Sequence, residues 1–311
     1  MSNPITTSFD AYVAKYPFLA NLTYKQAESD ESYKALVDLK GSDYSPIPDG
    51  VETHSVAGLG PMVERGETTP FAVDTPGPAG TKKSYYSNYA LRVKFTENLI
   101  MDAQYGIIEK VVASLGKGYN LARNLEVAAL YDDAFTGSLY TGPDGKALLA
   151  DDHTSYMGGA DRTNILATPA ALAYASVQDL VTVMRRQKDE RGYANPAIRN
   201  NQTIDVIIPP ELEFDADTIF DKGSAYNPTN ANNDINVLHK FRWNLIVNNH
   251  FTSTTNWFLA NPDEKGIRLV DRQALVASTN PDEDDYGVKY DVRARWVIHP
   301  EMWENLYGSH A

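Results

Sequence analysis

The feature that most constrains this chain is a change of apolar periodicity at Thr96-Glu97. Beyond that point, apolar residues recur about every 3.6 positions as far as Phe135, which predicts a helix over 96–135. A helix of that length spans on the order of 60 Å, more than a compact domain of this size needs to cover its core. The pattern therefore indicates a part that reaches neighbouring molecules. Ahead of it, the sequence alternates like a strand, and one face carries Tyr85, Ser87, Tyr89, Leu91, Val93 and Phe95.

A segment rich in glycine and proline, residues 74–83, precedes the alternating strand. We expect it to form the polar tip of a hairpin whose two strands extend from about Met62 to Phe95. Gly116 and Gly118 weaken the middle of the long helix, so a kink or two abutting helices are predicted there.

Composition narrows the class of protein. The 311 residues are 42% apolar, enough for one elaborated domain or two interleaved ones. A formal charge of −13 argues against a protein that grips phosphate backbones. The absence of cysteine excludes disulfides, thiol catalysis and cysteine-bound zinc. No stretch approaches the roughly 20 apolar residues of a membrane span, and the first residues lack the basic and apolar regions of a signal peptide.

The rest of the chain mixes helices and strands without regular alternation, which indicates the α+β class. Residues 1–60 join short amphipathic pieces by polar runs and are predicted to form an extended arm. Thr168 and Pro169 mark the start of a helix that ends near Gly192. Further predicted elements are a strand over 204–208, a helix over 211–222 and strands over 243–247 and 257–260.

The last predicted strand, residues 288–298, alternates most clearly. Its outward residues include Arg293 and Arg295, which are either solvated charges or partners of acidic groups on a neighbouring subunit. Its inward residues are Val288, Tyr290, Val292, Ala294, Trp296 and Ile298.

Two clusters have residues that could carry chemistry. Asp151, Asp152 and His153 could supply carboxylate and imidazole ligands to a metal, or act as an acid–base group. Adjacent residues rarely all point at one ion, so we interpret them as a structural turn. The acidic run 282–285 could bind calcium but lacks the pattern of an EF-hand loop, and a solvated turn is the simpler interpretation. No motif of a hydrolase, phosphate-binding loop or dinucleotide site is present. The sequence therefore predicts no enzyme activity and no catalytic, cofactor or metal site.

The order of these parts resembles the major capsid proteins of tailed bacteriophages. The resemblance rests on the arm, the hairpin, the long helix, the segment Asp144–His153 and the strand that ends in Pro209-Pro210-Glu211-Leu212. It looks closest to the Mu-like major head subunit group, in which a D-G-x-x-L-x-x-x-x-H segment and a strand ending in Pro-Pro-x-Leu recur.

This resemblance implies a Hong Kong 97-like phage capsid fold. Its expected parts are an N-terminal arm (1–60), an extended hairpin loop (61–95), a peripheral domain with a long spine helix (96–167 and 286–311) and an axial domain (168–285). The implied function is a structural head protein that self-assembles, as hexamers and pentamers, into an icosahedral shell around a DNA genome. The shell would be a virion component assembled in the host cytoplasm, with portal, scaffolding and head-decoration proteins as partners, no membrane and no cofactor.

Six residues on the hairpin and the last strand are candidates for contacts between subunits: Lys82, Lys83, Tyr85, Tyr89, Arg293 and Arg295. Two alternative functions stay open. One is the shell of an encapsulin-type compartment, which shares the fold and packages an enzyme. The other is a metal-dependent hydrolase that uses Asp151, Asp152 and His153.

Overall fold

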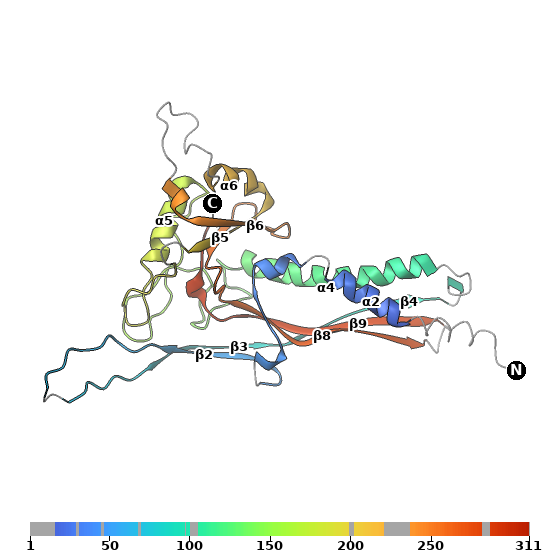
Figure 1. Cartoon of the computed structure of the whole chain (residues 1–311), viewed down its shortest axis with the longest axis horizontal. Coiled ribbons are helices and arrows are strands. Elements are labelled where there is room, and N and C mark those ends of the chain that lie inside the picture. Colours follow the sequence, from blue (N-terminus) through green and yellow to red (C-terminus); the bar gives the residue numbers. More distant parts are fainter. Residues whose placement is uncertain are drawn as a thin grey trace, which may run out of the picture.

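The computed structural model describes residues 16–28, 31–44, 47–67, 70–96, 98–99, 105–198, 202–220, 237–281 and 287–310. Within them the chain forms two four-stranded sheets and a two-stranded ribbon, with helices packed on both four-stranded sheets (Figure 1). The predicted α+β class is confirmed. None of the described helices is long and apolar enough to cross a membrane.

The first sheet has the order β1 (Asp38–Lys40), β8 (Ile267–Pro281), β9 (Val288–Pro300) and β4 (Ser87–Phe95). β9 runs antiparallel to both of its neighbours, and β1 runs parallel to β8. The predicted alternation of the last strand is confirmed, because its inward residues are all buried. The strand β8 was not predicted.

Helix α4 (Tyr105–Asp132) lies along this sheet, and α2 (Tyr16–Ala27) crosses it (Figure 1). The 28 residues of α4 span about 42 Å. The helix is continuous through Gly116 and Gly118, so the prediction of two abutting helices is wrong. Gly116 is a contact point: a Cβ there would collide with the carbonyl oxygen of Thr23 and lie 3.0 Å from the Ala27 nitrogen. The glycine therefore permits close helix crossing.

The second sheet has the order β10 (Leu306–Ser309), β7 (Trp257–Ala260), β5 (Thr203–Ile208) and β6 (Arg242–Val247). The predicted strands β5, β6 and β7 are confirmed. This sheet packs with α5 (Tyr174–Arg185) and α6 (Glu213–Phe220) around its own apolar core. Short 3₁₀ turns are η1 (Ser32–Ala35), η2 (Ser42–Tyr44), η3 (Pro210–Leu212), η4 (Val237–Lys240) and η5 (Trp303–Asn305).

Helix α5 is shorter than predicted at both ends. It begins at Tyr174 rather than at Thr168-Pro169, because Ser176 provides the cap: its Oγ accepts a hydrogen bond from the Ala173 N–H at 2.9 Å. It ends at Arg185, and residues 187–195 turn back as a small loop that is closed by a bridge between Lys188 and Ala194.

The ribbon consists of β2 (Gly50–Ala57) and β3 (Gly77–Tyr85), which project away from the second sheet (Figure 1). The distal loop joins them, and its described residues, 58–67 and 70–76, form no strand. The predicted hairpin tip at 74–83 is therefore wrong, since most of that segment is strand. Its glycines serve close packing instead of a turn. Gly80 has φ 117° beside a bulge, and a Cβ there would lie 2.8 Å from the Pro143 carbonyl oxygen.

Sheet membership does not follow the expected domain boundaries. Strand β8 falls in the segment 168–285, yet it pairs with β9 along its length in the first sheet. Strand β10 falls in the segment 286–311, yet it pairs with β7 in the second sheet. The last thirty residues of the chain thus connect the two sheets.

The two helical glycines of α4 provide a matched test of the crossing with α2. Alanine normally stabilises a helix relative to glycine by about 1 kcal/mol. We expect Gly116→Ala to reverse that sign and to destabilise the protein by about 1–3 kcal/mol, because rigid backbone atoms oppose the new methyl group. Gly118→Ala should be neutral or stabilising, since its nearest neighbour is a Leu91 methyl group at 3.6 Å. Denaturant unfolding of both variants measures the difference, and equal effects would contradict the tight crossing.

Candidate functional site

The segment Asp144–His153 is built around a buried imidazole. The His153 ring is fully buried, and its Nδ1 lies 2.7 Å from Asp144 Oδ2. Its Nε2 lies 3.3 Å from Asn164 Oδ1, and its ring stacks on Trp303 at 3.6 Å. Burial alone would raise the pKa of the Asp144 carboxyl, but the hydrogen bond and charge of His153 outweigh it and lower that pKa. Asp144 and His153, the first and last residues of the segment, thus form a structural pair.

The side chains of Asp151, Asp152 and His153 diverge. Asp152 forms an exposed ion pair with Lys146 at 2.5 Å, whereas Asp151 is exposed and His153 points into the core. Among the described residues, no three histidine or acidic side chains are placed to hold a metal ion. The geometry therefore supports the interpretation as a structural turn. The acidic run 282–285 lies outside the described residues.

Asn164 and Arg162 extend the contacts of this segment, and the sequence did not indicate either. The Asn164 amide donates hydrogen bonds to the carbonyl oxygens of Leu148 at 2.7 Å and Leu306 at 2.9 Å. It thereby joins the segment to β10. Neither residue belongs to a recognisable motif, so only the tertiary structure reveals them.

The buried guanidinium of Arg162 lies over the ring of Trp303, 4.7 Å from its centroid. It pairs with Glu190 of the 187–195 loop and with Glu304 at 3.3 Å. The segment 144–164, the 187–195 loop and the C-terminal residues are therefore one connected polar network.

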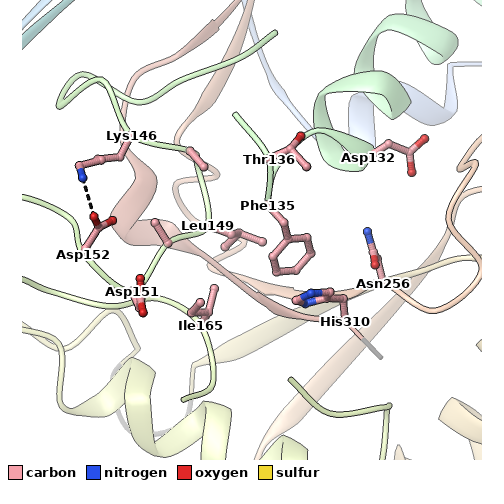
Figure 2. A pocket seen from close by; sticks show the side chains of 12 residues that line it. Asp132, Phe135, Thr136, Lys146, Leu149, Asp151, Asp152, Ile165, Asn256 and His310 are labelled. Atoms are coloured by element: carbon pink, nitrogen blue, oxygen red, sulfur yellow. Dashed lines mark hydrogen bonds and ion pairs between the residues drawn. The ribbon is translucent and has the colours of Figure 1, made fainter. Parts of the chain in front are cut away.

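A pocket of about 530 Å³ opens between the end of α4, the Asp144–His153 segment and the end of β10 (Figure 2). Phe135 and Leu149 contribute apolar surface, and His310 packs on Phe135 with ring centroids 4.7 Å apart. Lys146 and Asp152, which both line the pocket, form an ion pair with each other. The lining residues are Asp132, Phe135, Thr136, Lys146, Ala147, Leu149, Ala150, Asp151, Asp152, Ile165, Asn256 and His310.

The two hairpin lysines have different environments. Lys82 is half-buried, burial lowers its pKa, and its Nζ donates a hydrogen bond to Thr141 Oγ1 at 2.6 Å. Lys83 is exposed, 3.5 Å from Asp49 Oδ2 and 5.0 Å from the centre of the Tyr85 ring. Lys82 is thus engaged within its own subunit, and Lys83 remains accessible.

The two candidate tyrosines also differ. Tyr85 is 63% exposed. Tyr89 stacks on Trp296 at 3.7 Å and donates a hydrogen bond to Glu126 Oε2 at 2.8 Å. Of the candidate arginines, Arg293 is exposed, whereas the guanidinium of Arg295 lies 5.5 Å from the centre of the Tyr86 ring. Tyr85 and Arg293 therefore present the more accessible side chains, and contact with another subunit remains a prediction for all six candidates.

The base of the ribbon is held by a buried histidine that the sequence did not single out. His299 of β9 lies 2.8 Å from Thr53 Oγ1 on β2 and 2.9 Å from Ser84 Oγ on β3. Burial, together with the charges of Lys82 and Arg268, lowers its pKa from 6.5 to about 4. A neutral imidazole thus ties both strands of the ribbon to the first sheet.

The distal loop carries apolar side chains that its own subunit leaves in solvent. These residues lie upstream of the segment 74–83 that was predicted to be the polar tip, so the end of the hairpin lies in a different and more apolar part of the sequence. The large exposed side chains are Leu59, Met62, Val63, Phe71 and Val73, with Phe71 80% exposed.

A second uncovered apolar surface follows α4 and the neighbouring strand β4. Ile107, Leu121 and Leu125 lie on the outward side of the helix and are each about half exposed, as is Leu91 on β4. Gly118 lies next to Leu91, so the helix and the strand contribute to one surface there. The distal loop and this α4–β4 face thus each gather several exposed apolar side chains among the described residues; on the loop, the Arg65 guanidinium lies 4.5 Å from the centre of the Phe71 ring.

Comparison with known families assigns this architecture to a class. A family model described as phage capsid protein matches residues 87–307, which is more than half of the 311 residues. The chain belongs to the phage capsid protein family, and it is a virion component that forms a shell. No curated protein matches it.

Solved structures support the same fold at low identity. The capsid of the native GTA particle is 11% identical with a TM-score of 0.55, and 90% of each chain is covered. The virus-like particle from Pyrococcus furiosus is 10% identical with a TM-score of 0.52, covering 94% of this chain and 98% of the other. The capsid of cyanophage P-SCSP1u is 12% identical with a TM-score of 0.51, covering 90% and 87%. The fold is thus that of Hong Kong 97-like capsid subunits.

The Asp144–His153 pair can be tested against its exposed neighbour. Asp144→Ala leaves a buried ring nitrogen without its partner, so we expect it to lower the free energy of unfolding by about 2–4 kcal/mol. Asp151→Ala removes an exposed carboxylate and should change stability by less than about 0.5 kcal/mol. Thermal and denaturant melts of both variants give the comparison. Equal losses would contradict a structural role that is specific to Asp144.

The low pKa of His299 predicts a pH dependence of stability. As pH falls from 6.5 towards 4, the unfolded chain takes up a proton at His299 that the folded chain does not, so the contribution of His299 to stability decreases over this window and changes no further below it. The loss amounts to roughly 3 kcal/mol. His299→Gln should flatten the pH dependence of the unfolding free energy between 4 and 6.5. His54→Gln, at an exposed position on β2, is the comparison variant. A slope that persists in His299→Gln would show that other groups cause it.

Proposed function

We propose that this chain is the major head subunit of a tailed phage, which self-assembles as hexamers and pentamers into an icosahedral shell around a DNA genome. The observation that carries the proposal is the pair of uncovered apolar surfaces, the distal loop and the α4–β4 face. A monomer that kept both in water would be prone to non-specific association. Coverage of each by a neighbouring copy removes that exposure.

The two surfaces differ from one another, which decides the kind of assembly they support. A contact between different patches of identical chains is head-to-tail, and such contacts close into rings when the rotation fits. The distal loop projects from the ribbon, whereas the α4–β4 face lies on the body of the subunit (Figure 1). Each copy can therefore give its loop to one neighbour and receive the loop of another. Many such contacts reinforce one another in a closed shell.

The acidic composition fits a container for DNA better than a DNA-binding protein. A chain with a formal charge of −13 repels phosphate backbones on average. We therefore propose that the genome is held by confinement within the shell.

The expected domains of the capsid fold are assigned here from the membership of the two sheets. We assign the first sheet with α4 as spine helix to the peripheral domain, the second sheet to the axial domain, and residues 50–85 to the extended loop. Membership of the Mu-like group, assembly in the host cytoplasm, and portal, scaffolding and decoration partners belong to the same proposal. The divergent side chains of Asp151, Asp152 and His153 argue against the hydrolase alternative.

The test is removal of the loop end. Replacing residues 61–73 with a two-residue turn should leave the subunit folded, because the large side chains of this segment contact little of their own core. We expect the shortened protein to fail to form particles in negative-stain images and to remain small in light scattering. Normal particles from it would contradict the proposal. Particles of the intact protein that enclose an enzyme instead of a genome would favour the encapsulin alternative.

A matched pair of point variants controls for surface hydrophobicity. Phe71 and Phe214 are 80% and 81% exposed, on the distal loop and on α6. Phe71→Ser should lower particle yield, whereas Phe214→Ser should not. Equal losses would mean that the effect is not specific to the loop.

A further inference from the structure

One arginine spans the point where the two strands of the ribbon separate. The β2–β3 ladder ends at Ala57 and Gly77, and beyond it the two sides of the distal loop lack strand pairing. Arg191 reaches this neck from the 187–195 loop. Its Nε donates to the Gly58 carbonyl oxygen at 2.6 Å, and its Nη2 donates to that of Thr75 at 2.8 Å. The guanidinium therefore joins both sides of the neck where the ladder no longer does.

Asp74 completes this contact. Its Oδ1 accepts a hydrogen bond from Arg191 Nη1 at 3.0 Å, and its Oδ2 accepts the Gly60 N–H at 2.7 Å. The Gly60 N–H and the Arg191 guanidinium are both among the groups that lower the pKa of this carboxyl. The Asp74 carboxylate thus links the side of the neck that follows β2, at Gly60, to the side that precedes β3 and to Arg191.

The loop that presents Arg191 is itself fixed. Asp189 Oδ1 accepts the backbone N–H groups of Arg191 at 3.0 Å and Tyr193 at 2.8 Å. The adjacent Glu190 pairs with the buried Arg162. The Arg191 side chain is mostly shielded, with 17% of it exposed. The polar network therefore fixes the loop that carries Arg191, and the Arg191 guanidinium in turn fixes the neck.

We propose that Arg191 is a positioning residue that sets the direction of the distal loop, so that its apolar end meets a second copy of this chain. The inference rests on the proposed function of that loop. Three acceptors at different places require the planar fork of arginine, since lysine offers one compact ammonium. Arg191→Lys should therefore keep the charge and the ion pair with Asp74 but lose the span across the neck.

The direction of the loop can be measured on the unassembled subunit. The chain has no cysteine, so Val63→Cys and Leu139→Cys provide two unique sites for spin labels on the distal loop and on the body. We expect one narrow distance distribution in the parent protein, a broad one in Arg191→Ala and an intermediate one in Arg191→Lys. Arg186→Ala, at an exposed arginine just after α5, is the matched control and should stay narrow. Asp74→Asn, at a surface carboxylate, should broaden the distribution even if Arg191→Ala does not fold.

Assembly gives the second readout. Without the labels, Arg191→Ala should melt like Arg186→Ala but yield fewer particles, or particles of mixed diameter. An equally narrow distribution in the parent protein, Arg191→Ala and Asp74→Asn would overturn the proposal, as would normal particles from a subunit whose distribution has broadened. The loop-shortened protein separates the two ideas. If it assembles normally, the proposed function fails, whereas the distance measurement still decides whether Arg191 directs the loop.

Discussion

The attachment of α4 to the first sheet at Trp296 is the contact on which the rest of the structure depends. The indole is buried beneath the stacked ring of Tyr89, and Glu126 of α4 accepts hydrogen bonds from both the indole N–H at 2.7 Å and the Tyr89 hydroxyl at 2.8 Å. One carboxylate thereby joins the helix to two strands that lie far apart in the sequence. Helix α2 packs on α4, and the ribbon is joined to β4 and contacts β9. The positions of α2 and of the ribbon therefore depend on this contact.

Sequence patterns identified elements whose signals are local. The alternation of β9 and the apolar runs of β5 and β7 predicted strands correctly, because the burial pattern of each strand stays the same along most of its length. Strand β8 escaped detection because bulges between Asp271 and Val276 interrupt its alternation. The ribbon was misplaced because the same glycine-rich composition suits a turn and a close backbone approach, and only tertiary contacts distinguish them.

The candidate site also combines features that the sequence shows with features that only the fold shows. The spacing of Asp144 and His153 is visible in the sequence, but Asn164, Arg162 and Trp303 reach them from elsewhere in the fold. Arg191 carries no sequence signal at all, since an arginine in a polar loop is ordinarily solvated. The apolar residues of the distal loop are each unremarkable in sequence, and their meaning comes from a ribbon that carries them away from their own core. Family membership then supplies what isolated side chains could not: a reason for a subunit to leave such surfaces uncovered.

The polar network behind Arg191 has a mechanical consequence. A force that pulls on the distal loop reaches the 187–195 loop through the guanidinium, then passes through Glu190 and Arg162 to Trp303 and the C-terminal strand. This load path enters the second sheet and bypasses α4. Part of the tension transmitted between subunits would thus pass through short charged contacts and a stacked indole into the second sheet, beside the route along the ribbon strands into the first sheet.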